Sequence, residues 1–125
     1  MSTGVSILVA VALVLGLMFG FQQWMAARMR AHEGKEAPSL GSLGDPEGRV
    51  VWFYGPNCGP CHAMRPAIDA LGDRAIPVDV SEHMDVAMAY GVMATPTTVF
   101  VRNGSIAAVR PGRLSPDQLE GLLAA

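Results

Sequence analysis

The stretch NCGPCH, residues 57–62, contains both cysteines of this 125-residue chain. Two residues separate Cys58 from Cys61, which is the spacing of a dithiol that carries electrons by forming and breaking one disulfide. With His62 included, the same stretch matches the attachment motif of a c-type haem, in which the histidine is an axial ligand. The flanking sequence has to decide between these two interpretations.

The sequence on both sides of this motif predicts an α/β domain. VVWFY (50–54) is an unbroken apolar run, as expected for a strand that is buried on both faces. A helix is predicted from about Cys58 to Leu71, because apolar residues recur there at helical spacing. Further strands are predicted at 76–80, 97–101 and 105–109, and further helices at 82–90 and 116–123. This order favours a parallel pair of strands followed by an antiparallel hairpin.

Three local signals mark the boundaries of these elements. Asn103-Gly104 predicts a tight hairpin turn, since both residue types tolerate positive φ. Ser115 is a helix N-cap, with Pro116 at the first helical position. Pro66 lies inside the first predicted helix of the domain and is expected to bend it, because proline removes a backbone donor.

The N-terminal segment predicts a membrane anchor. Residues 2–27 carry no charge and are long enough to cross a bilayer as a helix, with Trp24 at headgroup level. A cleaved signal peptide is the alternative, but the start has no Lys or Arg and WMAARMR is a poor cleavage site. We therefore predict an anchor at 1–27, a linker rich in Gly, Pro and Ser at 28–47, and a folded domain at 48–125.

Composition narrows the classes of function. The net charge of −2 gives no basic surface for nucleic acid, and no phosphate-binding glycine motif occurs. Two cysteines three residues apart form no disulfide framework. We predict no nucleic-acid partner, no cofactor and no bound metal.

The order of elements, with CGPC at the start of a helix, resembles thioredoxin over about residues 48–125. Pro66 stands five residues after Cys61, where thioredoxin-like proteins have the proline that kinks this helix. YGVMATPTTVFVRNG (90–104) resembles the family's stretch around a cis-proline, which here is Pro96. The resemblance implies a thioredoxin-like fold, a mixed sheet flanked by helices, and a thiol-disulfide oxidoreductase acting on protein disulfides with an unidentified redox donor.

The sequence also departs from the family's pattern. Asn57 stands where a tryptophan usually precedes the first cysteine, and Trp52 stands at the place of the family's buried aspartate. Pro77 falls near that aspartate's usual lysine partner. The family's first strand and helix are reduced to about residues 38–48. The usual proton acceptor for the inner thiol is therefore absent.

The resemblance assigns the site residues. Cys58, at a helix N-terminus, is the nucleophile, because the helix dipole and free N–H groups favour its thiolate. Cys61, one turn further on, is the resolving thiol. Gly59 and Pro60 keep the first turn tight, and Pro60 has no N–H to leave unpaired there. If Pro96 is cis, the backbone of Thr95 faces Cys58 and shapes the groove that binds an extended substrate.

His62 has three alternative roles: haem ligand, group that tunes the thiol pKa, or plain surface residue. A haem protein would need a mostly helical domain, whereas a strand precedes the motif and a hairpin follows it. Zinc would need His62 and His83 to join the two cysteines, because structural zinc takes four ligands.

A copper carrier is an alternative because thiolate and thioether ligands select Cu(I). Met84, Met88 and Met93 offer thioethers, although methionines at helical spacing are usually core filler. A further alternative is a docking module with an idle dithiol.

Charge around the apolar segment bears on which side of the membrane the domain occupies. Arg28, Arg30 and Lys35 follow the segment and no basic residue precedes it, so the positive-inside rule favours the cytoplasmic side. Anchored relatives of the thioredoxin family usually work outside the cytoplasm. The periplasmic side is therefore the alternative.

Overall fold

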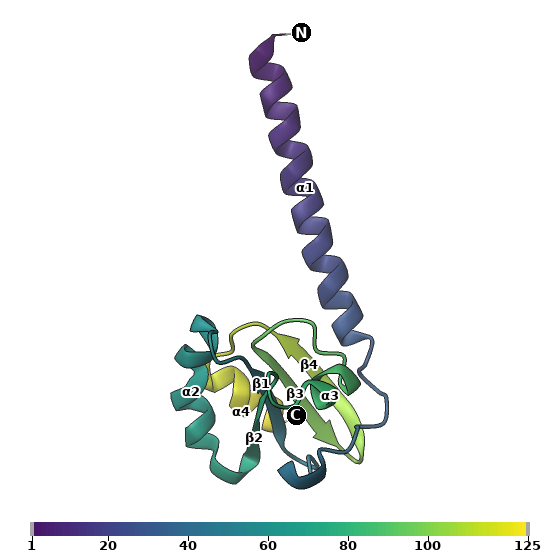
Figure 1. Ribbon diagram of the computed structural model, residues 1–125, viewed down its shortest axis with the longest axis vertical. Coiled ribbons are helices and arrows are strands. Elements are labelled where there is room, and N and C mark those ends of the chain that lie inside the picture. The colour runs from purple at the N-terminus through teal and green to yellow at the C-terminus, as the bar shows by residue number, and fades with distance from the viewer. Residues whose placement is uncertain (1, 125) are drawn as a thin grey trace.

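Four strands form one sheet in the order β2-β1-β3-β4, in a computed structural model that describes residues 2–124 (Figure 1). They are β1 (Val50–Tyr54), β2 (Ala75–Asp79), β3 (Thr97–Arg102) and β4 (Ser105–Pro111). β1 pairs with β2 in parallel and with β3 antiparallel, and β3 and β4 form a hairpin. The mixed sheet expected from the order of elements is confirmed.

The helices are α1 (Thr3–Arg30), α2 (Gly59–Leu71), α3 (Met84–Ala89) and α4 (Pro116–Ala124), with short 3-10 turns at Gly41–Leu43 and Gly72–Arg74. At α4, the Ser115 hydroxyl accepts from the N–H of Gln118, and the Gln118 side chain accepts from the N–H of Ser115. This reciprocal cap confirms the predicted start of α4.

α3 is shorter than the predicted helix at 82–90. The Asp79 carboxylate accepts hydrogen bonds from the N–H and hydroxyl of Ser81, and the Asp79 carbonyl accepts from the N–H groups of Glu82 and His83. These bonds hold the chain in a turn after β2, so helical geometry begins only at Met84.

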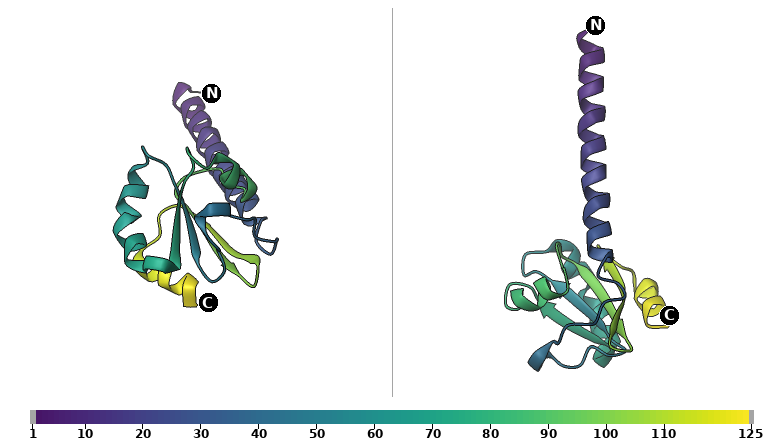
Figure 2. Two further views of the ribbon diagram at one scale, coloured as in Figure 1. Left: turned by 60° about the horizontal axis from the view of Figure 1, so that its bottom comes forward. Right: turned by 90° about the vertical axis from the view of Figure 1, so that its right-hand side faces the viewer.

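Each face of the sheet carries its own apolar core, because neighbouring residues of a strand point to opposite faces. Val50 and Trp52 face the side covered by α2 and α4, while Val51 and Phe53 face the side covered by α3 (Figure 2). The two faces add the following buried residues: Cys61, Met64, Ile68 and Leu119 on the first, and Met29, Leu40, Ala87 and Tyr90 on the second. β1 is thus buried on both faces, as predicted.

Part of the segment predicted as a linker, 28–47, lies against the sheet, while residues 28–30 continue α1. The N–H of Gly34 donates to the Ile106 carbonyl at 2.7 Å, and the N–H of Ile106 donates to the Lys35 carbonyl at 2.8 Å. The N–H of Ala37 donates to the Gly104 carbonyl at 2.9 Å. Residues 33–37 therefore run antiparallel beside β4 and cover its outer edge.

Residues 38–48, where the resemblance predicts a reduced first strand and helix, contain only the 3-10 turn at Gly41–Leu43. The Tyr90 hydroxyl donates to the Pro38 carbonyl at 2.7 Å, and Leu40 is buried in the core. The Glu47 carboxylate accepts from the N–H groups of Asn103 and Gly104 in the β3–β4 turn, where both residues have positive φ. The segment is thus attached at several points without forming a strand or an α-helix.

α1 is the one helix among residues 2–124 that is long and apolar enough to cross a membrane. None of its most hydrophobic window is buried against the rest of the chain. Its last turn is different, because Met29 is only 2% exposed and belongs to the core of the domain.

Candidate active site at the N-terminus of α2

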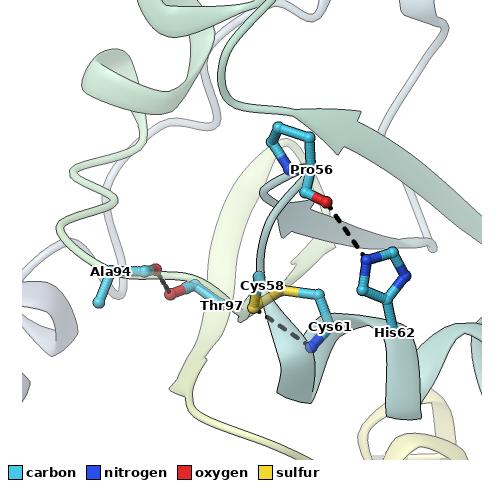
Figure 3. The surroundings of a disulfide bond; sticks show 6 residues. All are labelled: Pro56, Cys58, Cys61, His62, Ala94 and Thr97. Carbon is cyan, nitrogen blue, oxygen red and sulfur yellow. Dashed lines mark hydrogen bonds between the residues drawn. A yellow bond between two sulfur atoms is a disulfide. The ribbon is translucent and has the colours of Figure 1, made fainter.

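Cys58 and Cys61 are joined by a disulfide at the first turn of α2 (Figure 3). β1 ends at Tyr54, a three-residue turn follows, and Cys58 is the N-cap of the helix with extended φ and ψ of −95° and 111°. The two Cα atoms are 5.2 Å apart. The end of β1 therefore positions Cys58, and the first turn of α2 positions Cys61.

The two sulfurs differ in their access to solvent. Cys58 is half-buried, whereas Cys61 is 1% exposed and packs in the core beneath α2. Cys58 Sγ accepts a hydrogen bond from the N–H of Cys61 at 3.2 Å. A backbone donor at the positive end of a helix therefore points at the outer sulfur, an arrangement that stabilises a thiolate there.

The first turn of α2 contains the Gly-Pro pair, as expected from the sequence. Gly59 and Pro60 are its first two residues, so the missing N–H of Pro60 leaves no helical hydrogen bond unmade. The N–H of His62 donates to the Cys58 carbonyl at 3.2 Å. The exposed His62 ring turns toward the Pro56 carbonyl, with Nε2 3.2 Å from that oxygen (Figure 3).

The loop that contains Thr95 and Pro96 lies beside Cys58. The Thr95–Pro96 bond is cis, as predicted. A Cβ atom added to Gly55 would stand 3.5 Å from Thr95 Oγ1 and 3.8 Å from Cys58 Cβ, so these two side chains flank the same glycine. The Thr97 hydroxyl donates to the Ala94 carbonyl at 2.6 Å and closes this loop (Figure 3).

Two aromatic rings and one guanidinium group lie around the hollow that Cys61, the inner cysteine, helps to line. Trp52 is buried, pairs with Pro77 across the β1–β2 register, and stacks on Tyr54 at 4.8 Å. The Arg65 guanidinium lies 5.3 Å from the Trp52 ring centroid and 4.9 Å from that of Tyr54. These three side chains and Cys61 line a small hollow of about 40 Å³.

Two features of this hollow bear on its chemistry. Trp52 Nε1 is buried and has no hydrogen-bond partner within residues 2–124. Arg65 is exposed, but its guanidinium stacks over both aromatic rings. Its spacing of four residues from Cys61 is the signal that would have placed the two side chains in one hollow.

The expectation that the three methionines fill the core is wrong. Met84, Met88 and Met93 are 57%, 71% and 46% exposed. α3 has only six residues, and Ala87 is the one that is buried, so Met84 and Met88 lie on its outer side. Met84, Met93 and Thr95 belong to the lining of a second hollow of about 260 Å³, between α3 and the loop before β3.

The four ligands of the zinc alternative are not assembled. Within residues 2–124, no three His, Cys, Asp or Glu side chains form a group able to hold a metal ion. His83 directly precedes α3, and the His32 ring lies against Gly91, where an added Cβ atom would overlap it. His62 is therefore the one histidine that neighbours the dithiol.

Comparisons with known proteins agree with this geometry. The family model described as "Thioredoxin" matches residues 44–125. The chain is 32% identical over 80 residues to mitochondrial thioredoxin of Mus musculus, a match of 59% of this chain and 48% of that protein. It is 31% identical over 77 residues to thioredoxin of Bacillus subtilis, a match of 57% of this chain and 74% of that protein. The chain thus spans about half the length of the mammalian relative.

Two solved structures are similar in fold. Fasciola hepatica thioredoxin has a TM-score of 0.57 at 30% identity and covers 63% of this chain and 82% of its own. Mitochondrial thioredoxin 3 of Saccharomyces cerevisiae, in its oxidised form, has a TM-score of 0.53 at 35% identity and covers 60% of this chain and 74% of its own.

Proposed function

Because the chain belongs to the thioredoxin family, we propose that it is a membrane-tethered thiol-disulfide oxidoreductase that exchanges electrons with protein disulfides. One observation carries the proposal: a half-buried Cys58 receives a helix N–H, and a buried Cys61 lies one turn behind it. Disulfide exchange needs these two parts, an accessible attacking sulfur and a shielded resolving sulfur.

The reaction moves two electrons in two steps. The Cys58 thiolate attacks one sulfur of a substrate disulfide, and the other substrate sulfur leaves as a thiolate and takes a proton. Cys61, as a thiolate, then attacks Cys58 Sγ and releases the second substrate sulfur. The products are the Cys58–Cys61 disulfide and a reduced substrate. An unidentified dithiol donor reverses these steps to regenerate the enzyme.

Thr95 and Pro96 form one wall of the substrate groove in this proposal. Support comes from Gly55, because a side chain at that position would contact both Thr95 and Cys58. An extended substrate that lies along Thr95 brings its disulfide next to the outer sulfur. The buried Pro96 holds this wall at the start of β3, where its carbonyl accepts from the N–H of Gly112 at 2.9 Å.

Arg65 takes part in the resolving step. A cation near Cys61 favours the thiolate over the thiol, and this chain has Trp52 where the family's aspartate would accept the proton. Arg65→Gln in the Cys58→Ser background is expected to raise the pH midpoint of Cys61 thiolate absorbance, while Arg65→Lys keeps it. Equal midpoints in all three proteins would remove Arg65 from this role.

The membrane tether is α1. Its apolar surface is exposed along the whole candidate span, and its last turn continues directly into the core through Met29. The excess of Arg28, Arg30 and Lys35 after the span supports a domain on the cytoplasmic side. Labelling of Cys58 in intact cells with a membrane-impermeant thiol reagent distinguishes this side from the periplasmic alternative.

The test of the activity uses the full chain in detergent with a short disulfide-bonded peptide as substrate. Cys58→Ser is expected to abolish turnover, because no outer thiolate remains to attack. Cys61→Ser is expected to stop after one step and to accumulate a mixed disulfide through Cys58. Ala63→Ser, an exposed change in the same helix, is the matched control. Undiminished turnover by the Cys58 variant would disprove the proposal.

A further inference from the structure

The register of the sheet shows which end of the domain carries the dithiol. β1 runs from Val50 to Tyr54 and leads into Cys58, so the dithiol lies at the Tyr54 end. Thr97 pairs with both Phe53 and Pro111. The start of β3 and the end of β4 therefore lie at this same end of the sheet.

The segment after α1 enters the domain at that end too. Glu33 accepts from the N–H of Val109, near the end of β4, while Ala37 binds Gly104, in the turn before β4. The chain thus passes from the dithiol end toward the opposite end as it leaves α1. Figure 1 shows the result, since α1 rises from the end of the domain at which α2 begins.

Several contacts fix α1 in this position. Met29 is buried in the core, and the His32 ring lies against Gly91. Glu33 also pairs with Arg110 at 3.0 Å, with both side chains partly exposed. This ion pair contributes little energy on its own. It adds to the burial of Met29 and to the backbone hydrogen bonds between residues 34–37 and β4. The domain is therefore docked on the end of α1 rather than suspended from a free linker.

The distance from the bilayer to the domain is short. Trp24 marks the headgroup level, and each helical residue after it adds about 1.5 Å. The five residues from Trp24 to the buried Met29 therefore place the domain about 8 Å beyond that level. A folded domain of about 100 residues has a radius of gyration of about 13 Å, so it is too large to enter this space.

We infer that the redox partner of the dithiol is an integral membrane protein that presents its cysteine pair on a segment at the bilayer surface. The inference rests on the proposed function and adds the class of partner. Its basis is that the dithiol end of the domain faces the membrane into which α1 extends, at a separation that admits a chain segment but not a folded soluble protein.

The surface beside the dithiol fits such a segment. Met84, Met93 and Thr95 belong to the lining of an open hollow at the dithiol end, and Val92 and Ala94 complete its apolar character. Exposed methionines adapt to varied apolar side chains. A segment that emerges from the bilayer is rich in such side chains, so it can fill the hollow while its cysteine reaches Cys58.

The exchange with this partner balances as follows. One partner thiolate attacks Cys58 Sγ, the Cys58–Cys61 bond breaks, and Cys61 leaves as a thiolate. The second partner thiolate attacks its neighbour's sulfur in the mixed disulfide and releases Cys58. The partner is oxidised to a disulfide and Cys58 and Cys61 are reduced, with two electrons transferred.

The test uses the full chain with Cys61→Ser in lipid nanodiscs with a single-span apolar peptide. Two forms of the peptide are compared, and each carries an activated cysteine disulfide at both ends. In the surface form the cysteines lie at the bilayer surface, and in the tail form each lies beyond a flexible tail of about 20 residues. In a second version of the protein, about 12 Gly and Ser residues inserted between Trp24 and Met25 move the domain away from the bilayer. The insertion leaves Met29 and Glu33 with the domain.

The native spacing is expected to give mixed disulfide at least about tenfold faster with the surface cysteine than with the tail cysteine, because the docked domain holds Cys58 at that level. The insertion should reduce this preference to within about twofold. Equal rates for both peptides at native spacing would overturn the inference alone. If Cys58 in neither version reacts even with a small aromatic disulfide, the proposed function fails and the inference fails with it.

Discussion

α2 and α4 cover one face of the sheet with two helices, whereas α3, the end of α1 and the irregular segment 31–48 cover the other. The first face buries residues of α2 at helical spacing, together with Leu119 of α4. On the second face, the segment contributes the buried Leu40, the Pro38 carbonyl that accepts from Tyr90, and two carboxylates, those of Glu33 and Glu47, that accept from distant backbone N–H groups.

The difference shows two ways to cover a sheet. A helix satisfies its own backbone groups, so its apolar stripe needs no further attachment. An irregular segment must pair its backbone groups elsewhere. Here residues 34–37 bond with β4 and the β3–β4 turn, and the Pro38 carbonyl accepts from Tyr90. The dithiol belongs to the helical face, and the attachment of α1 belongs to the other.

The largest expected change in the free energy of unfolding comes from replacing one buried leucine on each face with alanine. Leu119→Ala is expected to lower the free energy of unfolding by about 3–5 kcal/mol, since Leu119 is 0% exposed under α4 and the helix cannot close the cavity. Leu40→Ala should cost only about 2 kcal/mol, because an irregular segment can relax into the space. Denaturant unfolding of the oxidised full chain in detergent, followed by Trp52 fluorescence in a Trp24→Phe background, measures both. Equal losses would contradict the distinction between the faces.

The helical face is also the one that the sequence predicts well. β1 is a continuous apolar run and β3 is rich in β-branched residues. α2 and α4 have local signals in Cys58-x-x-Cys61, in the spaced apolar residues and in the Ser115 cap. Each signal lies within one element, so it can be recognised without knowing the fold.

The other face depends on contacts that no local pattern shows. Glu33 bonds to Val109 and Arg110, and Glu47 bonds to Asn103 and Gly104, across more than fifty residues of sequence in each case. Composition alone therefore predicts a linker at 28–47, although residues 28–30 belong to α1 and residues 34–37 bond to β4 and the turn before it.

The site divides in the same way. The dithiol and the cis Thr95–Pro96 bond follow from motifs, whereas the place of Arg65 over Trp52 and Tyr54 depends on how α2 packs against β1. The exposure of Met84 and Met88 depends on the length of α3, which the hydrogen bonds of Asp79 set. Helical spacing alone gives no reason to expect either result.

A smaller effect is expected where one carboxylate holds the irregular segment to the β3–β4 turn. Glu47→Gln keeps one acceptor oxygen and loses the second bond, so the free energy of unfolding should fall by about 1 kcal/mol for this exposed site. Asp45→Asn is the matched control, because an amide oxygen can still accept from the N–H of residue 47 as Asp45 does at 3.0 Å. A loss in the control as large as in the Glu47 variant would show that general charge, rather than the two bonds, stabilises the segment.

The smallest expected change in stability comes from removing the Tyr90 hydroxyl, and the pH dependence of that change distinguishes it from the others. Tyr90→Phe removes the hydrogen bond to the Pro38 carbonyl and should cost about 1 kcal/mol or less near neutral pH. Burial raises the pKa of Tyr90 from 10.0 to about 12. Folding therefore favours the neutral phenol, and this contribution is complete below pH 10 and is lost as the pH rises to about 12.

The wild type should consequently lose more stability than Tyr90→Phe between pH 10 and pH 12, so that the difference between them shrinks across that range. Tyr54→Phe controls for the loss of a phenol on the helical face, where the Tyr54 hydroxyl makes no side-chain hydrogen bond within the described residues 2–124. Parallel stability curves for wild type and Tyr90→Phe up to pH 12 would mean that the phenol is open to solvent. The segment around Pro38 would then be loosely held, and the docking of α1 would depend on Met29 and residues 33–37 alone.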